Sequence, residues 1–128
     1  MKSPTLLVIE DEAPLRANIV RLLTAEGFQV IAAVDGDEGI RRARESRPDL
    51  VICDILMPRM DGYGVLAMLR SQPETATIPF IFLTASADKE DLARGLQSGA
   101  NEYVTKPFRI ADLLAAIRRR LGDSKDKG

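Results

Sequence analysis

The chain has 128 residues, of which 45% are hydrophobic and 29% are charged, and its formal net charge is −1. This length is typical of one domain that buries a core without disulfides, and this charge gives no bulk electrostatic case for binding nucleic acid or an acidic membrane surface. The sequence lacks histidine, which excludes a histidine-based triad or a histidine-ligated metal site, and no apolar run approaches the roughly 20 residues of a membrane span.

Five short, apolar and β-branched runs predict strands at residues 5–9, 29–34, 50–53, 80–83 and 102–105. Several of these runs are apolar throughout, which is typical of strands covered on both faces in a parallel sheet. The only cysteine, Cys53, ends the third run, so the chain forms no internal disulfide and a reducing, cytoplasmic setting is expected. At a buried strand position its thiol is expected to act as a small hydrophobe rather than as a redox sensor.

Amphipathic stretches alternate with these runs and predict helices. The first has Pro14 in its first turn and ends at Gly27, and the others cover residues 37–46, 62–71, 89–98 and 110–121. The fourth helix contains Gly95, which weakens it. The order predicts an α/β fold of five βα units, with helices on both faces of a parallel sheet. We assign residues 1–121 to one domain and residues 122–128 to a polar tail or linker stump.

Polar residues gather where the predicted strands end, and ligands of open α/β sheets bind beyond the carboxyl ends of the strands. These residues are Glu10, Asp11 and Glu12 after the first strand, Asp54 after the third, Thr84 after the fourth and Lys106 after the fifth. Adjacent carboxylates repel one another unless a cation relieves the repulsion, and an all-oxygen set of ligands suits Mg²⁺.

The same residues suit phosphoryl transfer. A carboxylate such as Asp54 is a nucleophile towards phosphorus, and a transferring phosphoryl group needs positive charge around its oxygens. Taken singly, each residue is an ordinary turn or cap residue. Together they predict a site in which Mg²⁺ and Lys106 supply positive charge and Thr84 supplies a hydrogen bond.

Four motifs carry a family resemblance. They are residues 7–12 (LVIEDE), 54–62 (DILMPRMDG), 82–85 (FLTA) and 99–108 (GANEYVTKPF). In this order and spacing the chain resembles bacterial two-component response-regulator receivers, the CheY-like family, over about residues 5–121. The resemblance implies a doubly wound, flavodoxin-like sheet with strand order 2-1-3-4-5. It also implies a cytoplasmic signalling domain. Such a domain is not an enzyme and catalyses only its own phosphorylation and dephosphorylation.

The resemblance assigns roles to individual residues. Asp54 matches the phosphoacceptor, Lys106 the phosphate-contacting lysine, Thr84 the switch hydroxyl and Tyr103 the aromatic switch residue. The residues that would hold Mg²⁺, or Mn²⁺, are Glu10, Asp11, Asp54 and Leu56, the last through its backbone carbonyl. The bond between Lys106 and Pro107 matches one that is cis in the family.

The resemblance also implies partners. Asp54 would take its phosphoryl group from a sensor histidine kinase or a phosphotransfer protein that docks near Leu15 and Phe108. The surface of the fourth helix, fifth strand and fifth helix would then change to signal to a partner or an output domain. That surface forms phosphorylation-dependent homodimers in transcription-factor receivers, although Asn101 and Glu102 replace the paired aspartates found there. Direct binding of nucleic acid or of a membrane by this domain is not expected.

Three alternative functions explain the sequence less well. Residues 34–37 (VDGD) follow an apolar strand, as does the nucleophile motif of haloacid-dehalogenase-type phosphatases, but Asp35 and Asp37 are better explained as a turn and a helix cap. A pseudo-receiver that only binds proteins is disfavoured because the acids, Thr84 and Lys106 are all present. An enzyme that turns over small phosphoesters would need an acid or base beyond the acids already named.

Overall fold

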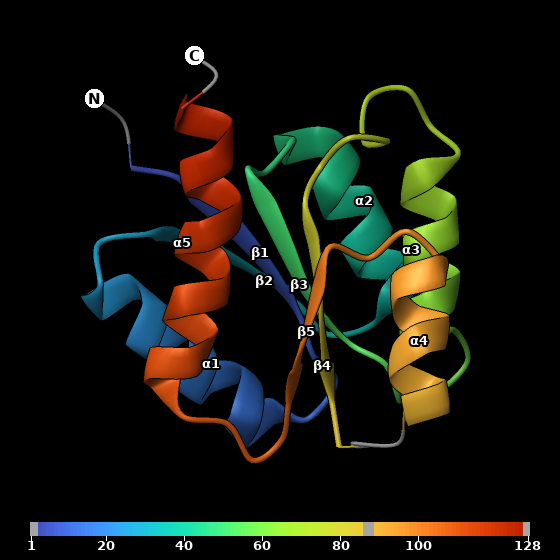
Figure 1. Ribbon diagram of the computed structural model, residues 1–128, viewed down its shortest axis with the longest axis horizontal. Coiled ribbons are helices and arrows are strands. Elements are labelled where there is room, and N and C mark those ends of the chain that lie inside the picture. The colour runs from blue at the N-terminus through green and yellow to red at the C-terminus, as the bar shows by residue number, and fades with distance from the viewer. Residues whose placement is uncertain (1–2, 86–88, 127–128) are drawn as a thin grey trace.

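The computed structural model of the protein describes residues 3–85 and 89–126. Strands and helices alternate along these residues (Figure 1). The elements are β1 (Thr5–Ile9), α1 (Ala13–Ala25), β2 (Gln29–Ala33), α2 (Gly36–Ser46), β3 (Leu50–Asp54), α3 (Gly62–Arg70), β4 (Phe80–Thr84), α4 (Lys89–Gln97), β5 (Glu102–Thr105) and α5 (Ile110–Asp126). No helix within the described residues is both long enough and apolar enough to cross a membrane.

The strands form one parallel sheet in the order β2-β1-β3-β4-β5, which confirms the predicted fold class and strand order. The register aligns the carboxyl ends of the strands, because Ile9 lies opposite both Ala33 and Cys53, and Thr84 lies opposite Thr105. Residues that follow these aligned positions therefore share one edge of the sheet.

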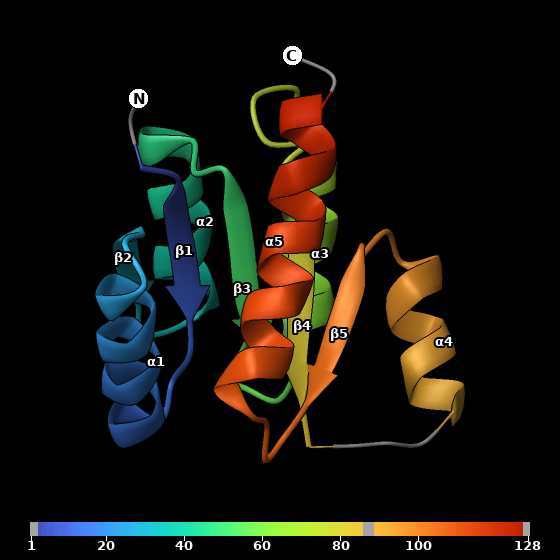
Figure 2. The same cartoon turned by 60° about the vertical axis from the view of Figure 1, so that its left-hand side comes forward.

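Helices cover both faces of the sheet, with α1 and α5 on one side and α2, α3 and α4 on the other (Figures 1 and 2). Side chains alternate between the faces of a strand. In β1, Leu6 and Val8 therefore pack with residues of α1 and α5, while Leu7 and Ile9 pack with residues of α2 and α3. The central strands are buried on both faces, which explains why their sequences are continuously apolar.

Local sequence signals fix several element ends. Gly27 adopts a φ of 97° directly after the C-cap of α1, a conformation that glycine reaches without steric cost. Asp35 is the N-cap of α2, where its side chain accepts a hydrogen bond from the Glu38 backbone N–H at 2.9 Å. The cap of this helix is therefore Asp35 and not Asp37, which lies in the first turn of α2. The second carboxylate oxygen of Asp35 lies 2.9 Å from the guanidinium of Arg59.

Several element ends differ from the sequence-based prediction. β2 ends at Ala33 because the N–H of Val34 donates to the Glu38 carboxylate at 2.7 Å and so joins the helix cap. β3 and β4 each include one more residue than predicted, Asp54 and Thr84. The helix α5 continues past Leu121 to Asp126, where the polar sequence contains no proline to terminate it.

Side chains tie α4 and the loop that follows it to α3. The guanidinium of Arg94, on α4, lies 4.2 Å from the centre of the Tyr63 ring, and this ring packs edge-on against Phe82. Arg70, at the end of α3, donates to the carbonyl oxygens of Ile78 at 2.8 Å and of Gly99 at 3.0 Å. Helices α3 and α4 lie on the face of the sheet opposite α1 and α5 (Figure 1).

Candidate functional site

The polar residues predicted from the strand ends come together at the carboxyl edge of the sheet. Glu10 and Asp11 follow β1, Asp54 ends β3, Thr84 ends β4, and Lys106 follows β5. Glu10, Asp54 and Thr84 are buried, whereas Asp11 is exposed. Buried polar groups are unfavourable unless they are paired, so a cluster of them at this edge indicates a functional site.

The three carboxylates form a compact group of oxygen atoms. One oxygen from each of Glu10, Asp11 and Asp54 lies within 4.8 Å of the others. Such a set could hold a hard divalent cation, which prefers carboxylate and carbonyl oxygen atoms. Leu56 lies two residues beyond Asp54 with its side chain 74% exposed, and the role of its backbone carbonyl stays a prediction.

Lys106 is the cation of this cluster. Its Nζ atom lies 3.0 Å from Oδ2 of Asp54 and 3.2 Å from Oε1 of Glu10. Burial by itself would lower the pKa of Lys106, but the hydrogen bond to Asp54 and the charges of both carboxylates outweigh it and raise that pKa above its ordinary value. The ammonium is therefore held charged against Asp54. The Lys106–Pro107 peptide bond is cis, as the resemblance implied.

The carboxyl group of Glu10 has a raised pKa. Burial raises its pKa to about 7, and the negative charge of Asp54 acts in the same direction. A hydrogen bond from the Glu12 backbone N–H, 3.1 Å from Oε2, and the nearby Lys106 oppose this shift only in part. Around neutral pH, Glu10 is thus divided between its protonated and ionised forms. A bound cation would shift this protonation equilibrium towards the carboxylate.

This pKa predicts a pH dependence of stability. The folded state holds the Glu10 proton up to about pH 7, while the unfolded chain releases it near 4.5. Without divalent cation, the free energy of unfolding should therefore fall as pH rises from about 5 to about 8. Urea unfolding in a chelating buffer measures this slope, and Glu10→Gln should flatten it. Equal slopes for both proteins would contradict the assignment of the titration to Glu10.

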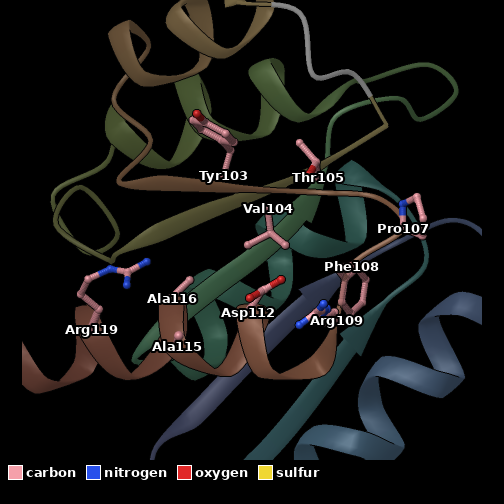
Figure 3. Close-up of a pocket in the computed structure, with 10 residues that line it drawn as sticks. All are labelled: Tyr103, Val104, Thr105, Pro107, Phe108, Arg109, Asp112, Ala115, Ala116 and Arg119. Carbon is pink, nitrogen blue, oxygen red and sulfur yellow. The ribbon is translucent and has the colours of Figure 1, made fainter.

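The two predicted switch residues lie in different surroundings. Thr84 is buried at the end of β4, next to the strand that carries Asp54. Tyr103, on β5, is 38% exposed and lies opposite Phe82 in the register. It lines a groove of about 460 Å³ between β5 and α5, together with Phe108 and Arg119 (Figure 3). The structure therefore places Thr84 at the acidic edge and Tyr103 on the outer surface.

Two residues of the site were missed by the sequence analysis. Gly62 begins α3 so close to the acidic strand that a Cβ atom there would lie 2.5 Å from the Asp54 carbonyl oxygen and 3.0 Å from the Phe82 ring. Arg16, on α1, donates from Nη1 to the backbone carbonyl of Glu10 at 2.9 Å and, at 3.4 Å, to that of Asp11. An arginine on an amphipathic helix gives no signal of such a contact in a single sequence, and Gly62 is distinguished only by its place in a motif.

Comparison with known proteins agrees with this geometry. The family model described as the response regulator receiver domain matches residues 6–118. This chain belongs to the response regulator receiver domain family, which confirms the resemblance carried by its four motifs.

Individual relatives are similar over nearly the whole chain. The transcriptional regulatory protein PrrA of Mycobacterium tuberculosis is 40% identical over 119 residues, an alignment that covers 93% of this chain and 50% of that protein. This chain thus spans about half the length of the relatives it matches.

Solved structures of receiver domains superpose closely on this one. A response regulator receiver domain protein from Clostridium thermocellum has a TM-score of 0.90 at 31% identity and covers 98% of this chain and 99% of its own. The receiver domain of a sensor histidine kinase from Pseudomonas aeruginosa, with a magnesium ion coordinated in its active site cleft, has a TM-score of 0.87 at 32% identity and covers 94% of this chain and 98% of its own.

Proposed function

We propose that this domain accepts a phosphoryl group onto Asp54 from a histidine kinase or phosphotransfer protein, in a reaction that requires Mg²⁺ or Mn²⁺. The observation that carries the proposal is the placement of the buried Asp54 carboxylate between two further acids and the ammonium of Lys106, at 3.0 Å. In this proposal Asp54 is the nucleophile and carries the phosphoryl group as an aspartyl-phosphate.

In the proposed reaction an oxygen of Asp54 attacks the phosphorus of a phosphohistidine or of a small donor such as acetyl phosphate. The new O–P bond forms as the bond to the leaving group breaks, and the leaving group keeps the electron pair. Lys106 faces the oxygens on which charge develops, and the Thr84 hydroxyl is the donor at the next strand end. A bound Mg²⁺, held by Glu10, Asp11, Asp54 and the Leu56 carbonyl, would neutralise negative charge on both reactants.

A second groove supports the docking of a phosphodonor protein beside this site. It has a volume of about 460 Å³ and runs between α1 and the loop after β5. Its lining includes Leu15, Asn18 and Phe108 around Lys106, so a partner seated there would reach the acidic edge. The wall is mainly apolar, which suits a protein partner that buries hydrophobic side chains.

We further propose that the phosphorylated state signals through the α4-β5-α5 surface. Thr84 would move towards the new phosphoryl oxygens and Tyr103 would turn inward, repacking a surface that includes the glycine-containing helix α4. The same surface would serve a phosphorylation-dependent homodimer or an output domain. A domain that serves a transcriptional regulator works in the compartment that holds the DNA, so a cytoplasmic location is part of this proposal.

The proposal assigns no nucleic-acid contact to this domain, and the pairing of its basic run supports that. Arg118 lies 3.0 Å from the Glu26 carboxylate, and Arg119 and Arg120 both pair with Glu102. These three guanidinium groups therefore pair with two carboxylates of the same chain, which leaves one net positive charge instead of a basic patch of three.

Intact mass spectrometry tests the proposed chemistry. Incubation with acetyl phosphate and Mg²⁺ should add a single phosphoryl group, and neither a chelator-treated sample nor Asp54→Asn should gain it. A matched control is Asp112→Asn, which changes an exposed carboxyl on α5 and should leave uptake unchanged. An adduct on Asp54→Asn would refute the acceptor assignment. No adduct from acetyl phosphate or from any phosphorylated kinase would favour the pseudo-receiver, and sustained release of phosphate from small phosphoesters would favour an enzyme.

A further inference from the structure

Arg16 connects α1 to the loop that carries the first two acids. Its Nη1 atom donates to the carbonyl oxygen of Glu10 at 2.9 Å and to that of Asp11 at 3.4 Å. The backbone N–H of Arg16 also donates to the Glu12 carbonyl at 2.9 Å, so the residue is fixed in the first turn of the helix. The side chain is half-buried.

The two acids of this loop are held in different ways. Both oxygens of the Glu10 carboxylate have a partner, the Glu12 N–H for one and Lys106 for the other. The Asp11 carboxylate is exposed and accepts no hydrogen bond within the residues that the structure describes. The position of the Asp11 carboxylate is therefore set by its own backbone. The side chain of Arg16 holds this backbone at the Asp11 carbonyl oxygen, and the Glu10 carboxylate holds it at the Glu12 N–H.

We propose that Arg16 is a positioning residue for the divalent-cation site, which it serves by fixing the loop backbone so that the Asp11 carboxylate stays with those of Glu10 and Asp54. This inference rests on the cation binding included in the proposed function. Groups that orient metal ligands without touching the metal commonly change metal affinity by tenfold or more when they are removed.

The sign of the effect separates this role from simple electrostatics. A guanidinium close to the acids repels a cation, so deleting its charge should by itself tighten cation binding. Loss of loop positioning should weaken cation binding instead. A variant without the Arg16 charge therefore distinguishes the two effects by the direction of the change.

Titration of the unphosphorylated protein with Mn²⁺, followed by the electron paramagnetic resonance signal of the free ion, measures the affinity without any phosphodonor. Arg16→Met, which keeps a long apolar stem, should raise the dissociation constant by about tenfold, and Arg16→Lys, which keeps the charge, should raise it less. Arg21→Met is the matched control, because Arg21 lies on the same helix and its guanidinium bonds to Asn18. It should bind Mn²⁺ like the wild type.

A second measurement excludes a merely structural role. In an Asp11→Asn background, Arg16→Met should cause no further loss of Mn²⁺ affinity, because Arg16 acts through Asp11. A full loss in that background would overturn the inference, as would unchanged or tighter binding by Arg16→Met alone. If Arg16→Met fails to fold, Arg16→Lys takes its place in the Mn²⁺ titration. Unchanged or tighter Mn²⁺ binding by Arg16→Lys would then overturn the inference.

The outcomes also separate this inference from the proposed function. Weaker Mn²⁺ binding by Arg16→Met in a protein whose Asp54 takes up no phosphoryl group would support the role of Arg16 and refute the acceptor role. Unchanged Mn²⁺ binding by Arg16→Met, together with normal phosphoryl uptake by Asp54, would refute only the role of Arg16. A wild-type protein that binds no Mn²⁺ would refute both.

Discussion

Lys106→Met is expected to slow phosphoryl uptake by Asp54 from acetyl phosphate by about 100-fold, the usual consequence of removing a group that stabilises developing charge. Nζ of Lys106 lies 3.0 Å from Asp54 Oδ2, so in the proposed reaction it would face the phosphoryl oxygens. Methionine has a similar length and no charge, and it leaves the acceptor carboxylate in place. The rate at which the phosphoryl adduct appears by intact mass at a fixed Mg²⁺ concentration measures the effect.

Arg109→Met is the matched control for this prediction. Arg109 is a cation of the same loop, but it lines the groove between β5 and α5 instead of the acidic edge (Figure 3). Its replacement should leave the rate within about twofold of the wild type, a difference that corresponds to well under 1 kcal/mol of barrier. A Lys106→Met rate as fast as that of Arg109→Met would exclude a role for Lys106 in the transfer.

Lys106→Met should also change the pH dependence of the free energy of unfolding. Lys106 lowers the pKa of Glu10 through its charge and its hydrogen bond, against the larger upward effect of burial. Without Lys106 the pKa of Glu10 rises further, so the variant should lose more stability than the wild type between about pH 5 and about pH 8. Equal losses in the two proteins would mean that Lys106 does not stabilise the ionised form of Glu10.

Gly62→Ala is expected to lower the free energy of unfolding by about 2 to 3 kcal/mol, at the upper end of overpacking effects. The added methyl group would lie 2.5 Å from the Asp54 carbonyl oxygen and 2.9 Å from the Ile55 Cα atom. Both are backbone atoms, so relief requires movement of the chain that carries the acceptor. Phosphoryl uptake should therefore slow together with the loss of stability, and urea unfolding and intact mass measure the two effects.

Gly122→Ala provides the comparison for Gly62→Ala. A Cβ atom at Gly122 meets nothing within 4 Å, and the residue lies inside α5, where alanine is favoured over glycine by about 1 kcal/mol. This variant should be as stable as the wild type or more so, with unchanged uptake. If the Gly62→Ala variant unfolds at the same urea concentration as the wild type, the loop after β3 accommodates the added methyl group without loss of stability.

The fold could be predicted because its determinants are local and repeated. Each central strand is a continuous apolar run, and each helix has one apolar face, so alternation along the chain was enough to indicate a parallel sheet. The acidic site could be predicted because parallel strands bring their carboxyl ends to one edge. Residues such as Asp54 and Lys106 are far apart in sequence, but each follows or ends a recognisable strand.

Features that depend on tertiary contacts could not be predicted in this way. The end of β2 depends on the N–H of Val34, which bonds to a helix side chain rather than to the sheet. The contact of Arg16 with the acidic loop depends on which rotamer a helical arginine adopts, and sequence spacing does not specify that. The raised pKa of Glu10 depends on burial, which the polar sequence around Glu10 does not indicate.

The two tyrosines of this chain give it a built-in optical signal. The sequence contains no tryptophan, so no indole takes up the excitation energy of Tyr63 and Tyr103, and the ultraviolet emission of the domain comes from these phenols. Tyr63 lies beneath the Arg94 guanidinium of α4, and Tyr103 is partly in contact with water on β5. Movement of α4 would uncover the first ring and inward rotation would shield the second, so fluorescence of the unlabelled protein tests whether the proposed conformational change occurs.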